Sequence, residues 1–268
     1  MRSGESISVA AFFAFVLLGW LRRLDRSRQR QVIGLGLLGT AMAGLVRVLS
    51  RSSPASAHII GDWLPSILLL LAYWQSGRFS STPNRQLQHW LERTDERWIG
   101  AFVGRWERDW RTSWIGNYFE VAYFLCYALI PLGVAVLYGA HRRNVVDVYW
   151  ATVLPPTLLC YLVIPFAPTI PPRLAHPRSY ARSKLQSVNF FVLRHASIQL
   201  NTFPSAHVVC TVAASLVLLK AVPLAGGIFL LVSLSIAAGA VLGRYHYLPD
   251  VIFGALLSVA VSGVTLCR

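Results

Sequence analysis

The sequence predicts an all-α membrane protein: a polytopic helix bundle of six to eight spans with an interfacial amphipathic segment. The first observation behind this prediction is composition, since 55% of the 268 residues are hydrophobic and only 13% are charged. A soluble domain has about 25% charged residues. The second is the arrangement of the apolar residues in long continuous runs, which are typical of spanning helices and not of alternating barrel strands.

The apolar runs are the candidate spans, and a spanning helix needs ~20 residues. They lie at about 6–21, 32–49, 59–75, 113–139, 144–166, 203–220, 224–242 and 249–267. The first run is short and the third contains Asp62 and Pro65, so the number of spans is six without these two and eight with them. No small-residue cleavage site follows the first run, which predicts an uncleaved membrane segment.

Two polar connections separate the runs. The stretch 75–110 is rich in Arg, Glu, Asp and Trp, with apolar residues near helical spacing. Tryptophan beside arginine is typical of the lipid interface, so we expect one or two amphipathic helices on the membrane surface, with a cytosolic linker as the alternative. The stretch 167–201 is rich in proline and basic residues, which predicts a loop without a spanning element.

The net charge of +14 could indicate nucleic-acid binding. The basic residues, however, lie between apolar runs, where they would meet lipid headgroups or anionic substrates. We therefore expect membrane lipids as partners and no nucleic acid. The four cysteines all lie within apolar segments without a paired motif, which argues against a disulfide framework or a zinc site.

Three short motifs stand at the ends of apolar runs: 171–173 (Pro-Pro-Arg), 204–207 (Pro-Ser-Ala-His) and 243–250 (Gly-Arg-Tyr-His-Tyr-Leu-Pro-Asp). One run leaves the membrane just before the first motif, and the next begins at the second. The run 224–242 then returns to deliver the third. The connectivity therefore places all three motifs on one side of the membrane.

The residue types in these motifs suit phosphoryl transfer. Asp250 could fix the tautomer of His246, an oriented neutral histidine can act as a nucleophile, and His207 can serve as a general acid. Arg173 and Arg244 could neutralise a phosphate. Pro204 fits the first turn of a helix, which would leave the amides of Ser205 and Ala206 free to bind an anion.

Other interpretations of these residues remain. A histidine at a membrane boundary can be structural or interfacial, and His207, His246 and Asp250 could hold a cation. No spacing here matches a metal motif such as His-Glu-x-x-His, so we predict no metal and no cofactor. His195 and Asn201 are further candidates for substrate contacts.

Taken together, the three motifs resemble the signatures of the membrane-bound type-2 phosphatidic acid phosphatase superfamily. The chain looks most similar to the branch that includes inositol phosphorylceramide synthases and related bacterial proteins. The resemblance implies that His246 forms a phosphohistidine with Asp250 as its partner, and that His207 protonates the leaving alcohol and then activates the acceptor. It also implies that Arg173, Arg244 and Ser205 bind the phosphate.

These observations predict an integral membrane enzyme that acts on a phosphorylated lipid. With water as acceptor it is a lipid-phosphate phosphatase, and with an inositol or lipid hydroxyl it is a phospho-head-group transferase. A non-catalytic lipid transporter or scaffold is the alternative of another class. We expect one membrane domain over 1–268, with a catalytic helix core at 113–267 and accessory spans and the interfacial segment at 1–112.

We expect the protein in the cell membrane with its active site near one face. The resemblance favours the extracytoplasmic face. The positive-inside rule favours the cytoplasmic face, because most of the 25 basic residues lie on the motif-bearing side when all eight runs span. The oligomeric state is left open.

Overall fold

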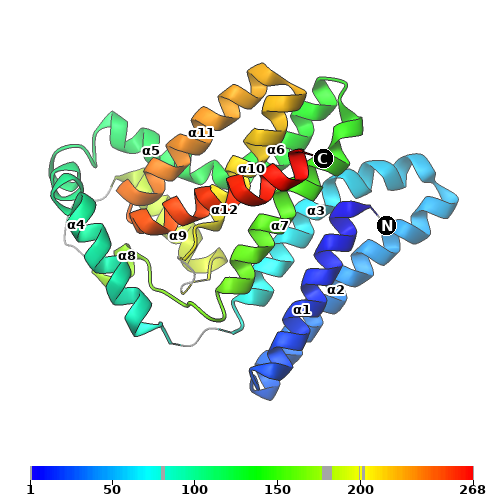
Figure 1. The fold of residues 1–268 in the computed structure, drawn as a ribbon, viewed down its shortest axis with the longest axis horizontal. Helices are drawn as coiled ribbons and strands as arrows, with labels where there is room; N and C mark the ends of the chain where they lie inside the picture. The colour runs from blue at the N-terminus through cyan, green and yellow to red at the C-terminus, as the bar shows by residue number, and fades with distance from the viewer. Residues whose placement is uncertain (1, 80–81, 177–182, 199, 201–202, 268) are drawn as a thin grey trace.

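The structure is a computed structural model and describes every residue except 1, 80–81, 177–182, 199, 201–202 and 268. In this described part the regular elements are all helices, which confirms the predicted all-α fold (Figure 1). The helices are α1 (Ser3–Leu21), α2 (Arg26–Ser52), α3 (Pro54–Ser76), α4 (Arg85–Asp109), α5 (Trp114–Phe124), α6 (Cys126–Gly139), the 3₁₀ helix η1 (Arg143–Val145), α7 (Val146–Val163), α8 (Pro172–Ala175), α9 (Lys184–Ala196), α10 (Ala206–Ala221), α11 (Pro223–Leu242) and α12 (Leu248–Leu266).

Among the described residues, six helical segments are long and apolar enough to cross a membrane: α1, α2, α3, η1 with α7, α11 and α12. The run predicted at 113–139 is not one straight helix. It forms α5 and α6, which meet at Leu125 with a bend of 61°, and counting this pair as one span gives seven. Helix α10 is apolar but shorter, with 16 residues.

Asp62, in the third run, is compatible with a continuous helix because its charge is paired. The carboxylate is fully buried in α3 and accepts hydrogen bonds from Arg2, Arg143 and Tyr138; the Arg143 Nε bond measures 2.7 Å. A buried charge without partners would cost several kcal/mol. These contacts fasten the beginning of α1, and with it the N-terminal helices, to the rest of the bundle.

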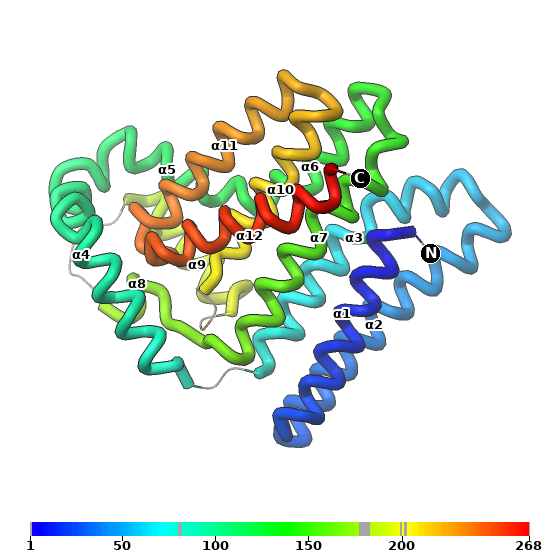
Figure 2. Tube along the Cα trace, in the orientation of Figure 1, coloured from blue at the N-terminus to red at the C-terminus, as the bar shows by residue number. Residues whose placement is uncertain are grey.

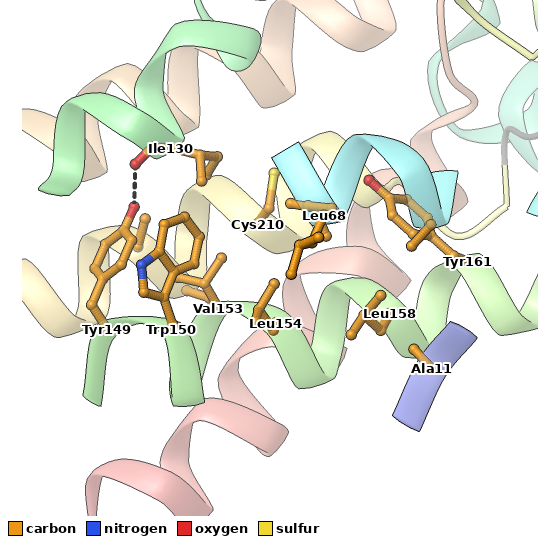
Figure 3. Close-up of a cluster of buried hydrophobic side chains, with 14 of the residues drawn as sticks. Ala11, Leu68, Ile130, Tyr149, Trp150, Val153, Leu154, Leu158, Tyr161 and Cys210 are labelled. Atoms are coloured by element: carbon orange, nitrogen blue, oxygen red, sulfur yellow. Dashed lines mark hydrogen bonds between the residues drawn. The ribbon is translucent and has the colours of Figure 1, made fainter. Parts of the chain in front are cut away.

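Helix α10 lies at the centre of the bundle, packed against α6, α7, α11 and α12. Side chains from α1, α3, α6 and α7 join α10 in a continuous apolar core (Figure 3). One polar group in this core is satisfied locally, because the Tyr149 hydroxyl donates to the Ile130 carbonyl over 2.7 Å. A central helix with its surface covered by neighbours can hold a functional group at its first turn rigidly.

The two polar connections differ from each other. The first forms a single long helix, α4, at the end of the molecule farthest from α1 and α2 (Figure 2). Its position at a membrane surface stays a prediction. The second was expected to be a loop, and that is wrong for part of it, since the short helix α8 and the 13-residue helix α9 form there. Helix α9 forms because its polar residues find partners inside the protein.

Candidate active site

The three motifs meet through backbone hydrogen bonds. The amide of Ser205, in the second motif, donates to the carbonyl of Asp250, in the third, over 3.0 Å. The amide of Arg173, in the first motif, donates to the carbonyl of Arg244 over 3.1 Å. The third motif is therefore the centre of the site, and the other two are attached to it.

The turn that carries His246 is a Schellman motif at the end of α11. The amide of Tyr245 donates to the carbonyl of Ala240 over 2.8 Å, and the amide of Arg244 donates to the carbonyl of Val241 over 3.0 Å. Arg244 has a φ of 60°, at the left-handed position that glycine usually takes. A non-glycine residue in this region of backbone conformation is strained, at a cost on the order of 1 kcal/mol.

The His246 ring lies between a carboxylate and a second imidazole. Its Nδ1 is 3.5 Å from Oδ2 of Asp250, and its Nε2 is 3.4 Å from Nδ1 of His207. The same Asp250 oxygen accepts the amide of Tyr247 over 2.9 Å, which fixes the carboxylate at the first turn of α12. A proton on Nδ1 facing Asp250 leaves Nε2 of His246 with its lone pair toward His207.

His207 lies in the first turn of α10, with aromatic rings around its imidazole. Its ring centroid is 5.4 Å from that of Tyr123 and 5.7 Å from that of Tyr127. Both tyrosines come from the segment where α5 bends into α6. The bend in the predicted span therefore places aromatic side chains against the second histidine.

The expected anion site at the start of α10 is wrong in its details. Helix α10 begins at Ala206, so Pro204 precedes the helix, after a cis peptide bond, and is not in its first turn. The amide of Ser205 is used by the Asp250 carbonyl and is not free. The hydroxyl of Ser205 is different: it is fully buried and has no hydrogen-bond partner among the described residues.

The Arg173 guanidinium rests on aromatic rings. Its central carbon is 5.4 Å from the ring centroid of Tyr245 and 5.8 Å from that of Phe190. Tyr245 in turn stacks on Tyr123 with centroids 3.9 Å apart, and its hydroxyl donates to Glu120 over 2.5 Å. Within the described part of the chain no carboxylate pairs with Arg173.

This environment leaves a cation available for an anionic ligand. Burial lowers the pKa of Arg173 from its ordinary value, which shows that its charge is poorly solvated. An arginine remains protonated even so, because its ordinary pKa lies far above neutral pH. A phosphate group would supply the missing charge and hydrogen-bond acceptors.

The Arg244 guanidinium, by contrast, already has partners within the protein. Its Nη1 is 3.4 Å from Oε1 of Glu107, and its Nη2 donates to the Pro172 carbonyl over 3.1 Å. Only its Nε has no partner among the described residues. The side chain also lines a cavity of about 550 Å³ beside α4, together with residues such as His89, Asp95, His176 and Tyr247.

The two remaining candidates are not brought to the histidines by the described structure. His195 is exposed at the end of α9, where its Nδ1 lies 2.8 Å from the Phe191 carbonyl. It lines a different cavity, of about 510 Å³, with Trp74, Arg78 and Ser197. Asn201 lies outside the described residues.

Several residues that support the site were missed in the sequence. Gln88 donates to the Tyr247 hydroxyl and Asp95 accepts the Leu248 amide, each over 2.8 Å, so α4 holds the start of α12. Burial raises the pKa of Asp95 to about 6. Glu107 binds Arg244. These partners are far from the motifs in the chain, and no local spacing signals them.

In the part of the chain that the structure describes, no three His, Cys, Asp or Glu side chains are grouped so that they could hold a metal ion. A family model described as the PAP2 superfamily matches residues 89–264, more than half of the chain. No curated protein and no solved structure matches the sequence.

Proposed function

Because the chain belongs to the PAP2 superfamily, whose members are phosphatase or phosphotransferase types, we propose that it transfers the phosphoryl group of a phosphorylated lipid through His246. The observation that carries this proposal is the His246 ring, held between Asp250 and His207 at 3.5 and 3.4 Å. A nucleophile with an orienting carboxylate on one side and an acid on the other is the arrangement that covalent phosphoryl transfer needs.

The first half of the reaction forms a phosphohistidine. Nε2 of His246 attacks phosphorus while its Nδ1–H is held by Asp250, and the bond from phosphorus to the lipid oxygen breaks. His207, in the form that carries a proton, gives that proton to the leaving oxygen, so the alcohol leaves neutral. Because the two ring nitrogens are only 3.4 Å apart, the phosphoryl group must replace their contact when it binds.

The second half restores the enzyme. His207, now neutral, takes a proton from the acceptor hydroxyl, whose oxygen attacks phosphorus as the phosphorus–nitrogen bond breaks. His207 is left protonated and His246 returns to its starting state. Throughout, Arg173 carries the charge of the phosphoryl oxygens, because no carboxylate competes for it in the described part of the chain.

We assign Ser205 and Arg244 supporting roles in phosphate binding. The buried Ser205 hydroxyl has no described partner and stands two residues before His207. It can therefore donate a hydrogen bond to a phosphate bound beside His207. Arg244 has Nε left for a ligand, since Glu107 and the Pro172 carbonyl occupy its other nitrogens. Its main contribution is to hold the turn that carries His246.

The molecule that accepts the phosphoryl group distinguishes two possible functions of this site. Water gives a lipid-phosphate phosphatase, and an inositol or lipid hydroxyl gives a head-group transferase of the kind found in the inositol phosphorylceramide synthase branch. We propose the phosphatase first, because it needs no second binding site. We place residues 113–267 as the catalytic helix core, with α4 of the accessory part completing it through Gln88, Asp95 and Glu107.

We propose the extracytoplasmic face of the cell membrane for the site, following the resemblance. A membrane-impermeant lipid phosphate added to sealed, oriented vesicles tests this, since only sites on the exposed face turn it over.

The test of the reaction is phosphate release by the detergent-purified protein from a panel of lipid phosphates and diphosphates, beside His246→Ala. We expect release from at least one lipid and none from the variant. No phosphate release from the folded wild-type protein would contradict the phosphatase. If added inositol or lipid alcohol also gave no phosphorylated product, the result would contradict the proposal as a whole and favour a non-catalytic scaffold.

A further inference from the structure

Helix α9 has a polar side that faces the protein. Asn189 donates to the carbonyl of Glu120 over 2.9 Å and to its carboxylate over 2.7 Å. Gln186 accepts a hydrogen bond from Nε of Arg111 over 3.0 Å. Both side chains are buried, so this side of α9 is fixed to α5 and to the segment after α4.

A second side of α9 is apolar and exposed. Leu185, Val188 and Phe191 are 39%, 52% and 65% exposed. Their spacing of three residues places them next to one another along the helix, and we call them the apolar strip. Ser187 and Arg194, seven residues apart, form a third side that is exposed and polar.

A helix with these three sides is poorly suited to water. Apolar residues that are exposed together usually mark a contact with another molecule or a membrane. Helix α9 also packs against a helix expected to meet lipid, since α5 is part of a candidate span and exposes Tyr118, Val121 and Phe124.

The charges at the ends of α9 match a lipid surface. Lys184 is the first residue of the helix and Arg194 lies in its last turn, so there is a basic residue at each end of the apolar strip. Long basic side chains can keep their charge among phosphate headgroups while their stems contact apolar chains. An apolar strip with a polar strip beside it is the pattern of a helix that lies in the plane of the interface.

We propose that α9 is embedded in the bilayer interface, with the apolar strip in the acyl chains and the side of Ser187 and Arg194 toward water. Helix α9 is then a membrane-bound element and not part of an aqueous loop. Phe190, one residue before Phe191, carries the Arg173 guanidinium on its ring. Embedding α9 brings the lipid surface next to the proposed phosphate site.

Spin labels on single cysteines test this proposal without any reaction. Cys267 is the exposed native cysteine and the other three are buried, so Cys267→Ser gives the background. Labels are placed at Val188→Cys and Phe191→Cys, with Ser187→Cys and Arg194→Cys as matched exposed controls on the same helix. Collision with oxygen and with a water-soluble nickel chelate is then measured in phospholipid vesicles.

We expect oxygen to dominate over the nickel chelate at 188 and 191, and the reverse at 187 and 194. Equal access of the nickel chelate at 187, 188 and 191 would show that α9 faces water and would overturn the proposal. The same measurement on a His246→Ala background gives the same expected pattern, so failure of the proposed reaction does not affect it.

Discussion

The amide of Ser205 donates to the carbonyl of Asp250 over 3.0 Å, so the residue before α10 and the first turn of α12 are joined directly. This contact sets the distance between two motifs that are 45 residues apart in the chain. His207 follows Ser205 by two residues, and His246 precedes Asp250 by four. The separation of the two histidines therefore depends on how closely α10 and α12 approach.

Gly254 permits that approach. A Cβ atom added there would lie 2.8 Å from the Ser205 carbonyl oxygen, a backbone atom that cannot move aside alone. We predict that Gly254→Ala separates the helix starts and lowers the turnover number by about 10–100-fold, as a displacement near 1 Å can. Gly263→Ala on the same helix is the control, since nothing lies within 4 Å of its added Cβ. Equal activity of the two variants would contradict this role of Gly254.

Asp250→Asn tests how the His246 ring is oriented. An amide can still accept the Tyr247 amide bond and keep the first turn of α12, but it cannot stabilise a charged imidazole. We predict a loss of roughly 10³–10⁴-fold in turnover with an unchanged melting temperature, by analogy with the carboxylate of a catalytic triad. A loss below about tenfold would show that Asp250 serves the fold and not the histidine.

Replacing each of the two arginines by alanine should have different effects: Arg173→Ala should mainly lower activity, and Arg244→Ala should mainly lower stability. Arg173→Ala should lower kcat/KM by about 10²–10³-fold with little loss of stability, because no ion pair is broken in the described structure. Arg244→Ala leaves Glu107 with less compensation for its buried charge, so we predict a melting temperature lower by several degrees. Thermal unfolding and lipid-phosphate kinetics on both variants check this. A lower melting temperature in Arg173→Ala, with a loss of activity but not of stability in Arg244→Ala, would contradict the two roles.

The raised pKa of Asp95 predicts that the free energy of unfolding depends on pH. Burial raises its pKa from 3.8 to about 6, so between these values the folded protein binds more protons than the unfolded chain. Its contribution to stability is therefore complete below about pH 4 and is lost as the pH rises through about 6. Asp95→Asn can still accept the Leu248 amide and should melt higher than wild type at pH 7.5, with the difference disappearing near pH 4. A wild-type protein that gains stability relative to the variant as the pH rises from 4 to 7.5 would contradict the prediction.

The fold and the meeting of the motifs were predictable because both depend on hydrophobic length. Runs near 20 residues are long enough to span, and the alternating direction of successive spans predicts that Arg173, His207 and His246 lie on one side. This placement does not depend on whether the third run, which contains Asp62, spans the membrane. The structure shows why this run still forms a helix: the charge of Asp62 is neutralised by Arg2 and Arg143, which are distant in the sequence.

The surroundings of the motifs were not predictable, because they depend on long-range polar contacts. Glu107 and Arg244 are 137 residues apart, and Tyr245 and Glu120 are 125 apart. Helix α9 was missed for the same reason, since it is stabilised by Asn189, which donates to Glu120, and by Gln186, which accepts a hydrogen bond from Arg111. The bend at Leu125 interrupts a run whose hydropathy is continuous, so composition alone does not reveal it.

The proposed reaction depends on a covalent phosphohistidine at His246. The most direct measurement is a rapid acid-free quench after mixing the protein with a lipid carrying a radioactive phosphate, followed by denaturing electrophoresis and peptide mapping. We predict a label that is stable to alkali, released by acid and located on the peptide with His246, and absent in His246→Ala. Phosphate release without a trapped label, retained in His246→Ala, would show that the phosphoryl group passes directly to the acceptor and would contradict the account.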